Sequence, residues 1–353
     1  MSARNDKAGI FFALPALLLL GFSIVLPFVA ATVMTLTDQR MLTPNPTEFV
    51  GLDNYQRLLS IRVHSVQPLR DDAGAIQRDD EGAIQYSNSP TIQQATNDLP
   101  PYQELGIFHF GDSLYAILVR DPIFWQSLIN TFLFVLLVVP FQIGAALGLA
   151  LLVKNPIGGR TAFRTFFFAP VVTSMVVVSI VWAFLYNENS GLINQILGVF
   201  AGGVVAINWL GSEALALPAI ALMSAWQGAG FQMIIILAGL QSIDEQLYEA
   251  ARLDGATAWQ QFRHVTLPGL RNTLTFVVVT TTIAAFALFV QVDVMTQGGP
   301  NDATTTLIYH AVQSGFREQD VAYGASVAVV YFLIVLSIAL IQRRVASSSE
   351  RKR

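Results

Sequence analysis

The sequence predicts an all-α membrane protein with six transmembrane helices and an external insertion between the first and second spans. Composition is the first observation behind this prediction. Of the 353 residues, 53% are hydrophobic and 12% are charged, which is typical of membrane proteins. Length is the second, because six segments provide the roughly 20 largely apolar residues that a helix needs to cross a bilayer. None of these segments contains Asp, Glu, Lys, Arg or His.

The six predicted spans are separated by polar segments. They cover residues 9–36, 124–153, 166–186, 217–240, 274–291 and 321–341. The start of the fifth span is open, since 268–273 begins with Pro268 and also suits the first turn of a helix. Arg4 and Lys7 precede the first segment as they do in a signal peptide. Its 28 residues exceed the usual signal-peptide core, so we expect an uncleaved span.

Apart from the arginines of the long loop at 37–121, which count little in the positive-inside rule, the basic residues gather on one side of these spans. They are Arg4, Lys7, Lys154, Arg160, Arg164, Arg252, Arg263, Arg271, Arg343, Arg344, Arg351, Lys352 and Arg353. The short loops on the opposite side hold a single arginine, Arg317. The positive-inside rule therefore predicts that both termini are cytoplasmic.

This topology divides the chain into four parts. Residues 1–36 form the cytoplasmic N-terminus and first span, and 37–121 form the extracytoplasmic insertion. Residues 122–341 form the membrane core, which includes a cytoplasmic loop at 241–268, and 342–353 form a basic cytoplasmic tail.

The insertion contains an eight-residue repeat, in which 70–77 and 78–85 differ only at Ala73 and Glu81. It predicts either a small module of two short strands that contacts an external partner, or a duplicated solvated loop. We favour the solvated loop because acidic loops are usually solvated. The acidic cluster at 79–81 lacks the full set of oxygen ligands that calcium requires. The chain has no cysteine, which excludes disulfides and thiolate chemistry.

The loop at 241–268 predicts two short helices joined by a bend. Ser242 and Glu245 suit a capping box at the start of the first helix. Asp254-Gly255 suits a turn with positive φ, and 256–264 suits a second helix with Trp259 and Phe262 on one side. Such a unit outside the bilayer is a rigid element that a partner protein can bind.

The same loop carries a spacing that points to a family. Glu249-Ala250-Ala251 is followed by three residues, Gly255, nine residues, Val265, one residue and Leu267-Pro268. This pattern resembles the signature loop of permease subunits of binding-protein-dependent ABC importers. Other stretches resemble the carbohydrate-type, maltose and glycerol-phosphate permease-like branch, namely 49–55, 121–131, 164–170, 191–194, 238–241 and 298–309.

The resemblance implies the type I importer fold in a bacterial or archaeal cytoplasmic (inner) membrane. It implies four kinds of partner: a homologous second permease in a heterodimer, two ATP-binding cassette subunits, an extracytoplasmic solute-binding protein and membrane lipid. It also implies a set of loop residues that contact the ATPase. They are Glu249, Ala250, Ala251, Asp254, Gly255, Phe262, Leu267 and Pro268.

The chain itself lacks the residues for catalysis. Its three lysines, Lys7, Lys154 and Lys352, do not follow glycine, so no phosphate-binding loop is present. The four histidines are scattered over loops without a nearby nucleophile. We therefore expect a transport subunit that is not an enzyme and binds no cofactor or nucleic acid, with ATP and Mg on the partner ATPase.

Polar and aromatic residues inside the predicted spans are candidates for the solute path. They are Ser224, Trp226, Gln227, Gln232, Thr281, Phe286, Phe289 and Gln291. Neutral hydrogen-bonding groups beside rings suit a sugar or oligosaccharide. Helix packing is the favoured explanation for any single one of them except Gln227, which belongs to a cluster. A non-sugar solute, such as a polyol, glycerol phosphate or peptide, stays an alternative. A secondary carrier is less favoured, because the spans lack ionisable groups for a coupling ion.

Overall fold

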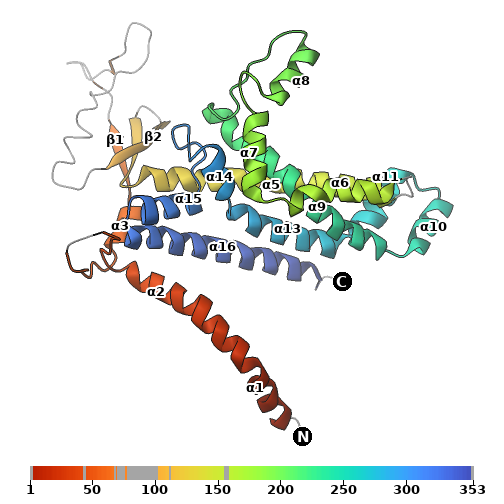
Figure 1. Ribbon diagram of the computed structural model, residues 1–353, viewed down its shortest axis with the longest axis horizontal. Helices are drawn as coiled ribbons and strands as arrows, with labels where there is room; N and C mark the ends of the chain where they lie inside the picture. The colour runs from red at the N-terminus through yellow and green to blue at the C-terminus, as the bar shows by residue number, and fades with distance from the viewer. Residues whose placement is uncertain are drawn as a thin grey trace. The chain divides into compact units, whose positions relative to one another are not determined.

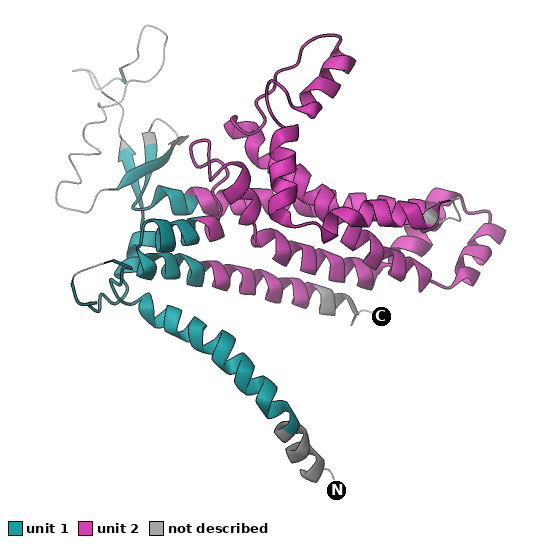
Figure 2. Ribbon diagram, viewed as in Figure 1, with its two compact units in different colours: residues 1–125, 310–330 teal, residues 126–309, 331–353 magenta. Residues whose placement is uncertain are grey.

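The computed structural model describes residues 3–42, 45–66, 69, 76–77, 102–110, 113–154 and 159–350. Two compact units make up the chain (Figure 2). Met1–Trp125 and His310–Val330 form unit 1, and Gln126–Tyr309 and Tyr331–Arg353 form unit 2. Helices dominate both units (Figure 1).

Unit 1 begins with one long apolar helical stretch. It is made of α1 (Ala3–Leu20), the π-helical turn η1 (Gly21–Val25) and α2 (Leu26–Met34). The segment Phe12–Met34 is long and apolar enough to cross a membrane, and its large side chains are exposed. This agrees with the predicted first span, since lipid is the natural environment for such a surface.

The insertion holds a small antiparallel sheet, which corrects the all-α prediction. After α3 (Asp53–Leu59), the strands β1 (Ile61–Val66), β2 (Gln103–Phe110) and β3 (Ser113–Val119) pair in the order β1-β3-β2. In β3, aromatic and β-branched residues favour an extended chain, and Ala116, Leu118 and Val119 are buried. The repeat at 70–85 lies outside the described residues except for 76 and 77.

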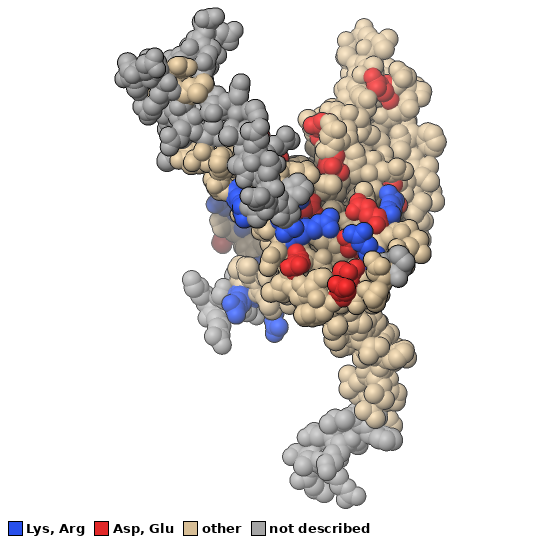
Figure 3. All heavy atoms as spheres, turned by 90° about the vertical axis from the view of Figure 1, so that its left-hand side faces the viewer, with Lys and Arg blue, Asp and Glu red and all other residues tan. Residues whose placement is uncertain are grey.

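Backbone hydrogen bonds join two distant segments of unit 1. Met41 N–H donates to the carbonyl of Gln319 at 2.9 Å, and Ala322 N–H donates to the carbonyl of Gln39 at 3.0 Å. Arg57 forms an ion pair with Asp320 at 3.3 Å. On the face in Figure 3, basic and acidic side chains lie intermixed, as such pairing requires.

Unit 2 is built around α9 (Glu213–Gln241), the most buried of the described candidate spans. The other elements of the membrane core are α5 (Pro122–Lys154), α6 (Arg160–Val172), α7 (Met175–Leu185), α8 (Leu192–Ala201), α10 (Glu245–Leu253), α11 (Ala258–Gln261), η2 (Phe262–Thr266), α12 (Leu267–Gly269), α13 (Arg271–Phe286), α14 (Val290–Met295), α15 (Leu307–Val312), η3 (Gln313–Arg317) and α16 (Val321–Glu350). Of these, η3, the end of α15 and the starts of α5 and α16 belong to unit 1. Apolar side chains of α5, α9 and α13 pack against one another in two core clusters.

Two of the predicted spans are bent. Four helices of the described chain are long and apolar enough to cross a membrane, and six spans result only if each bent pair counts as one. The predicted span at 166–186 breaks between α6 and α7 with a bend of 101°. Pro170 lacks an N–H group, and Thr173 and Ser174 have extended ψ values of 140° and 132°, which ends the helix there. The second bent pair is Ala258–Gly269 with Arg271–Phe286, which meet at 67°, so Pro268 lies before the bend and α13 begins after it. The predicted span at 274–291 is also interrupted after Phe286, and α14 begins at Val290.

Candidate functional site

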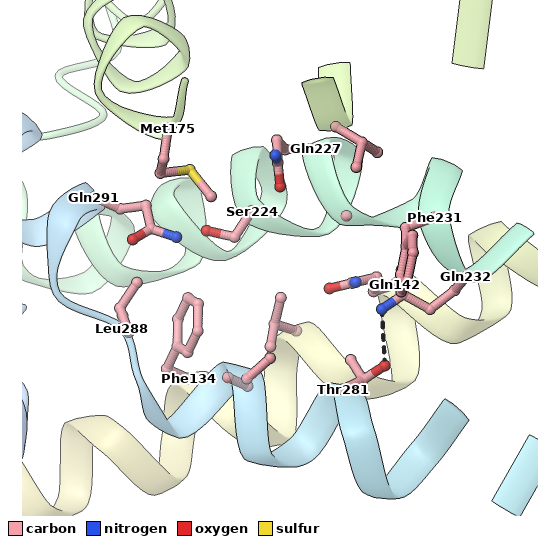
Figure 4. A pocket seen from close by; sticks show the side chains of 15 residues that line it. Phe134, Gln142, Met175, Ser224, Gln227, Phe231, Gln232, Thr281, Leu288 and Gln291 are labelled. Atoms are coloured by element: carbon pink, nitrogen blue, oxygen red, sulfur yellow. Dashed lines mark hydrogen bonds between the residues drawn. The ribbon is translucent and has the colours of Figure 1, made fainter. Parts of the chain in front are cut away.

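A cavity of about 250 Å³ lies within unit 2, against the middle of α9 (Figure 4). Its wall comes from α5, α6, α7, α9, α13, Leu288 and α14. Five of the eight residues predicted for the solute path line it, namely Ser224, Gln227, Gln232, Thr281 and Gln291. Among the described residues, none that lines the cavity is charged, so its polar character comes from amides and hydroxyls.

Hydrogen bonds position two of the glutamines. Gln232 Nε2 donates to Thr281 Oγ1 at 3.1 Å, which ties α9 to α13 (Figure 4). Gln227 Nε2 donates to the carbonyl of Pro170 at 3.3 Å, next to the break between α6 and α7. These bonds orient the amides against neighbouring elements.

Two buried oxygens at the cavity have no hydrogen-bond partner among the described residues. They are Ser224 Oγ and Gln232 Oε1, and both residues are only 8% exposed. A buried polar atom without a partner costs about 1–3 kcal/mol. A solute whose hydroxyl groups enter the cavity would satisfy these oxygens, so they are suited to bind a polar neutral ligand.

Gln142 of α5 is a lining residue that the sequence reasoning missed. It is 7% exposed and lies beside Gly228 of α9. A Cβ atom at position 228 would collide with the Gln142 amide, so the glycine makes room for this side chain. The sequence feature that could have revealed Gln142 is a single amide side chain in the middle of an otherwise apolar run. The missed apolar lining, which has no comparable signal, includes Phe134, Val138, Met175, Phe231 and Leu288.

Three residues predicted for the path lie away from the cavity wall. Trp226 is 45% exposed and its ring contacts Trp182, with centroids 5.3 Å apart. Phe286 is buried against Phe132, and Phe289 packs on Tyr309. Helix packing therefore accounts for these three aromatic side chains.

The first helix of the 241–268 loop, α10, starts differently from the prediction. Asp244 is its N-cap and accepts a hydrogen bond from Gln246 N–H at 2.9 Å. Ser242 instead ends α9, and its hydroxyl donates to the carbonyl of Gly239. The predicted capping box of Ser242 with Glu245 was wrong because Asp244, an equally good N-cap residue, directly precedes the helix.

The bend of the loop agrees with the prediction. Gly255 has a φ of 76°, the left-handed region that glycine adopts without strain, and Ala256 N–H donates to the carbonyl of Ala251 at 2.9 Å. A hollow of about 370 Å³ follows the bend. Of the predicted loop residues, Ala251, Asp254 and Gly255 line this hollow.

The second half of the loop is shorter as an α-helix than the predicted 256–264. Thr257 caps α11 through a capping box with Gln260, and η2 follows. The rings of Trp259 and Phe262 stack with centroids 5.4 Å apart, so they share one side as predicted. Trp259 is 66% exposed, and Leu253 in the first half is 89% exposed. The loop thus presents large apolar side chains that this chain does not cover.

The remaining predicted loop residues occupy several elements. Glu249 and Ala250 lie in α10, and Leu267 and Pro268 lie in α12, where the proline takes a first-turn position. These four and Phe262 do not line the hollow.

Comparison with known proteins agrees with this architecture. Residues 113–350 match the family described as "Binding-protein-dependent transport system inner membrane component". The lactose transport system permease protein LacF of Rhizobium radiobacter is 35% identical, over 63% of this chain and 76% of LacF. The sulfoquinovosyl glycerol transport system permease protein SmoG of Agrobacterium fabrum is 33% identical, over 68% of this chain and 77% of SmoG.

A solved structure shares the fold. It is a bacterial ABC transporter involved in the import of the acidic polysaccharide alginate, with a TM-score of 0.69 and 17% identity, over 98% of this chain and 96% of the other. The family match covers more than half of the chain, and the relatives are ABC sugar transport permeases. The chain therefore belongs to the family of inner membrane components of binding-protein-dependent ABC transport systems.

Proposed function

We propose that this chain forms half of the translocation path of an ATP-driven importer for a sugar or oligosaccharide. The observation that carries the proposal is the cavity on α9, whose wall offers amides and hydroxyls but no charge. A sugar needs such partners for its hydroxyls and apolar surfaces for its CH groups. Phe134 and Phe231 supply aromatic surface in the same wall. LacF and SmoG carry sugar-containing solutes in their names, which supports this class.

The lining of the cavity also discriminates between the alternative classes of solute. A phosphorylated or otherwise anionic solute usually binds through arginine or lysine, because charge-assisted hydrogen bonds are the strong ones. In the part of the chain that the structure describes, no arginine or lysine lines the cavity. A neutral sugar or polyol is therefore favoured over glycerol phosphate.

We further propose that the loop at 241–268 couples the chain to a separate ATPase. Supporting this, the loop forms a bent two-helix unit whose apolar side chains Leu253 and Trp259 are exposed. Glu249 would make polar contact with the ATPase, and Ala250 and Ala251 would allow close approach. Gly255 sets the angle between the two helices.

The proposed assembly has a homologous second permease, two ATPase subunits that bind ATP and Mg, and an extracytoplasmic solute-binding protein. The proposed location is a bacterial or archaeal cytoplasmic membrane with both termini in the cytoplasm. Lipid surrounds the spans, whose outward faces are apolar.

The test uses the assembled transporter in proteoliposomes. ATP turnover should rise when the binding protein and solute are added. Gly255→Val should abolish this rise, because a β-branched residue at positive φ is strained by about 1–3 kcal/mol. Gly255→Asn is the matched control, since asparagine tolerates this region and space is open around the position. If Gly255→Val kept the full rise, the coupling role of the loop would be refuted.

A further inference from the structure

A third hollow of unit 2 lies away from the solute cavity, between α13 and the end of α16. Its volume is about 510 Å³, within the roughly 300–1,000 Å³ typical of small-molecule pockets. It is lined by Leu267, Pro268, Arg271, Leu274, Thr275, Val278, Val279, Ile341, Gln342 and Val345. We call this feature the α13–α16 groove.

The floor of the groove is apolar and follows two helix faces. On α13, Leu274 and Val278 are four residues apart and therefore lie on one face. On α16, Ile341 and Val345 have the same spacing, and both side chains are exposed. Open apolar surface of this shape suits a hydrocarbon chain.

The charged residues that flank the groove along the sequence of α13 and α16 are all basic. Arg271 lines the groove at the first turn of α13, and Arg343 and Arg344 directly follow Gln342 on α16. No Asp or Glu occurs between Asp254 and Asp293 or between Asp320 and Glu350. Arg271 therefore makes this end of the groove complementary to an anion, and two further cations follow the lining residue Gln342 in the sequence.

The groove also offers an unpaired acceptor. Gln342 Oε1 is buried and has no hydrogen-bond partner among the described residues. A ligand with a hydroxyl group could donate to it. An anionic head that carries hydroxyls meets both requirements of this end of the groove, a negative charge for the arginines and a donor for Gln342.

The position of the groove relates it to the membrane surface. Arg271 begins α13, whose apolar run follows, and Arg343 lies near the end of the apolar segment Val321–Val345. Both helices thus pass from apolar to basic sequence at the groove, on the side that the basic residues predict to be cytoplasmic. Basic pockets between membrane helices on that side are suited to anionic lipid head groups.

We propose that the α13–α16 groove binds one anionic phospholipid of the cytoplasmic leaflet. Its phosphate lies at Arg271 and Arg343, and one acyl chain lies along the apolar floor. A soluble anion would use the arginines but leave the floor empty. A second protein helix would fill the floor but place no anion at the arginines.

The test measures lipid retention by native mass spectrometry of the purified transporter, with phosphatidylglycerol and phosphatidylcholine as probes. Neither solute nor ATP turnover enters this measurement, so its outcome is independent of the transport proposal. Wild type should retain phosphatidylglycerol in preference to phosphatidylcholine. Each of Arg271→Gln and Arg343→Gln should lower phosphatidylglycerol affinity about fivefold, while Arg271→Lys should keep most of it.

Two further variants test the floor and the specificity. Val278→Trp fills the groove and should lower phosphatidylglycerol retention, whereas Val177→Trp, at an exposed valine of α7, should not. Arg62→Gln, in the external sheet, should also leave retention unchanged. Unchanged retention in the Arg271→Gln and Arg343→Gln double variant would overturn the proposal. Loss in that variant without loss in Val278→Trp would also overturn it, because the ligand would then be an anion without a chain in the groove.

Crosslinking tests a protein occupant. The chain has no cysteine, so Leu18→Cys and Val278→Cys introduce a single pair. Absence of a disulfide is expected when lipid occupies the groove. An efficient disulfide within the chain would show that the first span covers the groove and would overturn the proposal.

Discussion

His310 Nε2 lies 3.0 Å from Asp121 Oδ2, and the two residues are 189 positions apart in the chain. Tyr323 donates its hydroxyl to the same carboxylate oxygen, and the guanidinium of Arg57 lies over the Tyr323 ring at 3.9 Å. The cluster is buried in unit 1 and joins the segment before α5 to α15 and α16. A charged group at the centre of such a cluster links the stability of the unit to pH.

The first prediction concerns acid stability. Burial alone would raise the pKa of Asp121, but the hydrogen bond and charge of His310, with the hydrogen bonds from Tyr323 and the Phe124 N–H, outweigh it. The pKa falls from 3.8 to about 2. Because the folded pKa lies below the unfolded one, the ionised carboxylate stabilises the fold above pH 3.8. This contribution, about 2 kcal/mol, is lost as the pH falls through about 2.

The measurement is the thermal unfolding midpoint in detergent at pH 7 and across pH 5 to 2. Asp121→Asn should lower the midpoint at pH 7 and lose less of its remaining stability in the acid range. Asp53→Asn, at an exposed aspartate of α3, should keep the wild-type acid dependence. A wild-type acid dependence in Asp121→Asn would contradict the assignment.

The second prediction follows from the contact between Gly228 and Gln142. In Gly228→Ala the added methyl group meets the Gln142 amide, which is the flexible end of a side chain and can move aside. We therefore expect a nearly unchanged unfolding midpoint but a higher KM for uptake, since Gln142 lines the solute cavity. Initial uptake rates in proteoliposomes measure this. Gly144→Ala on α5 is the control, because its Cβ has open space and alanine is favoured in helices by about 1 kcal/mol.

The apolar runs of the sequence predict most of the membrane core, but not its bends. The predicted 124–153 and 217–240 correspond closely to α5 and α9. Hydropathy alone could not reveal the turn at Thr173, because a broken helix and a straight one have the same apolar composition. Only the proline and the two hydroxyl residues after it hint at the break.

The sequence predicts those residues of the candidate site that are polar side chains within an apolar helix. Ser224, Gln227 and Gln232 stand out in an apolar helix, and the structure places them at one cavity. Trp226 lies beside them in the sequence but points to a different face, because neighbouring residues of a helix are about 100° apart. Partners from distant segments, such as Gln142, come from packing, which a single sequence does not specify.

The third prediction separates these neighbours. Gln227→Leu should lower uptake, because it removes a hydrogen-bonding amide from the cavity wall, while assembly with the ATPase stays intact. Trp226→Phe should leave uptake close to wild type, since its ring packs on Trp182 away from the cavity. Solute uptake and co-purified ATPase are measured for both. Equal effects of the two substitutions would remove Gln227 from the path.

The last prediction concerns the cap of α11 in the proposed coupling loop. Thr257 accepts a hydrogen bond from Gln260 N–H, and the Gln260 side chain accepts one from Thr257 N–H at 2.7 Å. Thr257→Ala removes the hydroxyl and should cost about 1 kcal/mol of local stability. A region held by so short a helix opens locally, so trypsin should cut the variant at Arg263 roughly fivefold faster than wild type. The solute-stimulated ATP turnover of the variant should also fall. Thr257→Ser keeps the hydroxyl and should behave like wild type. Equal cleavage rates in all three proteins would show that the capping box does not hold this part of the loop.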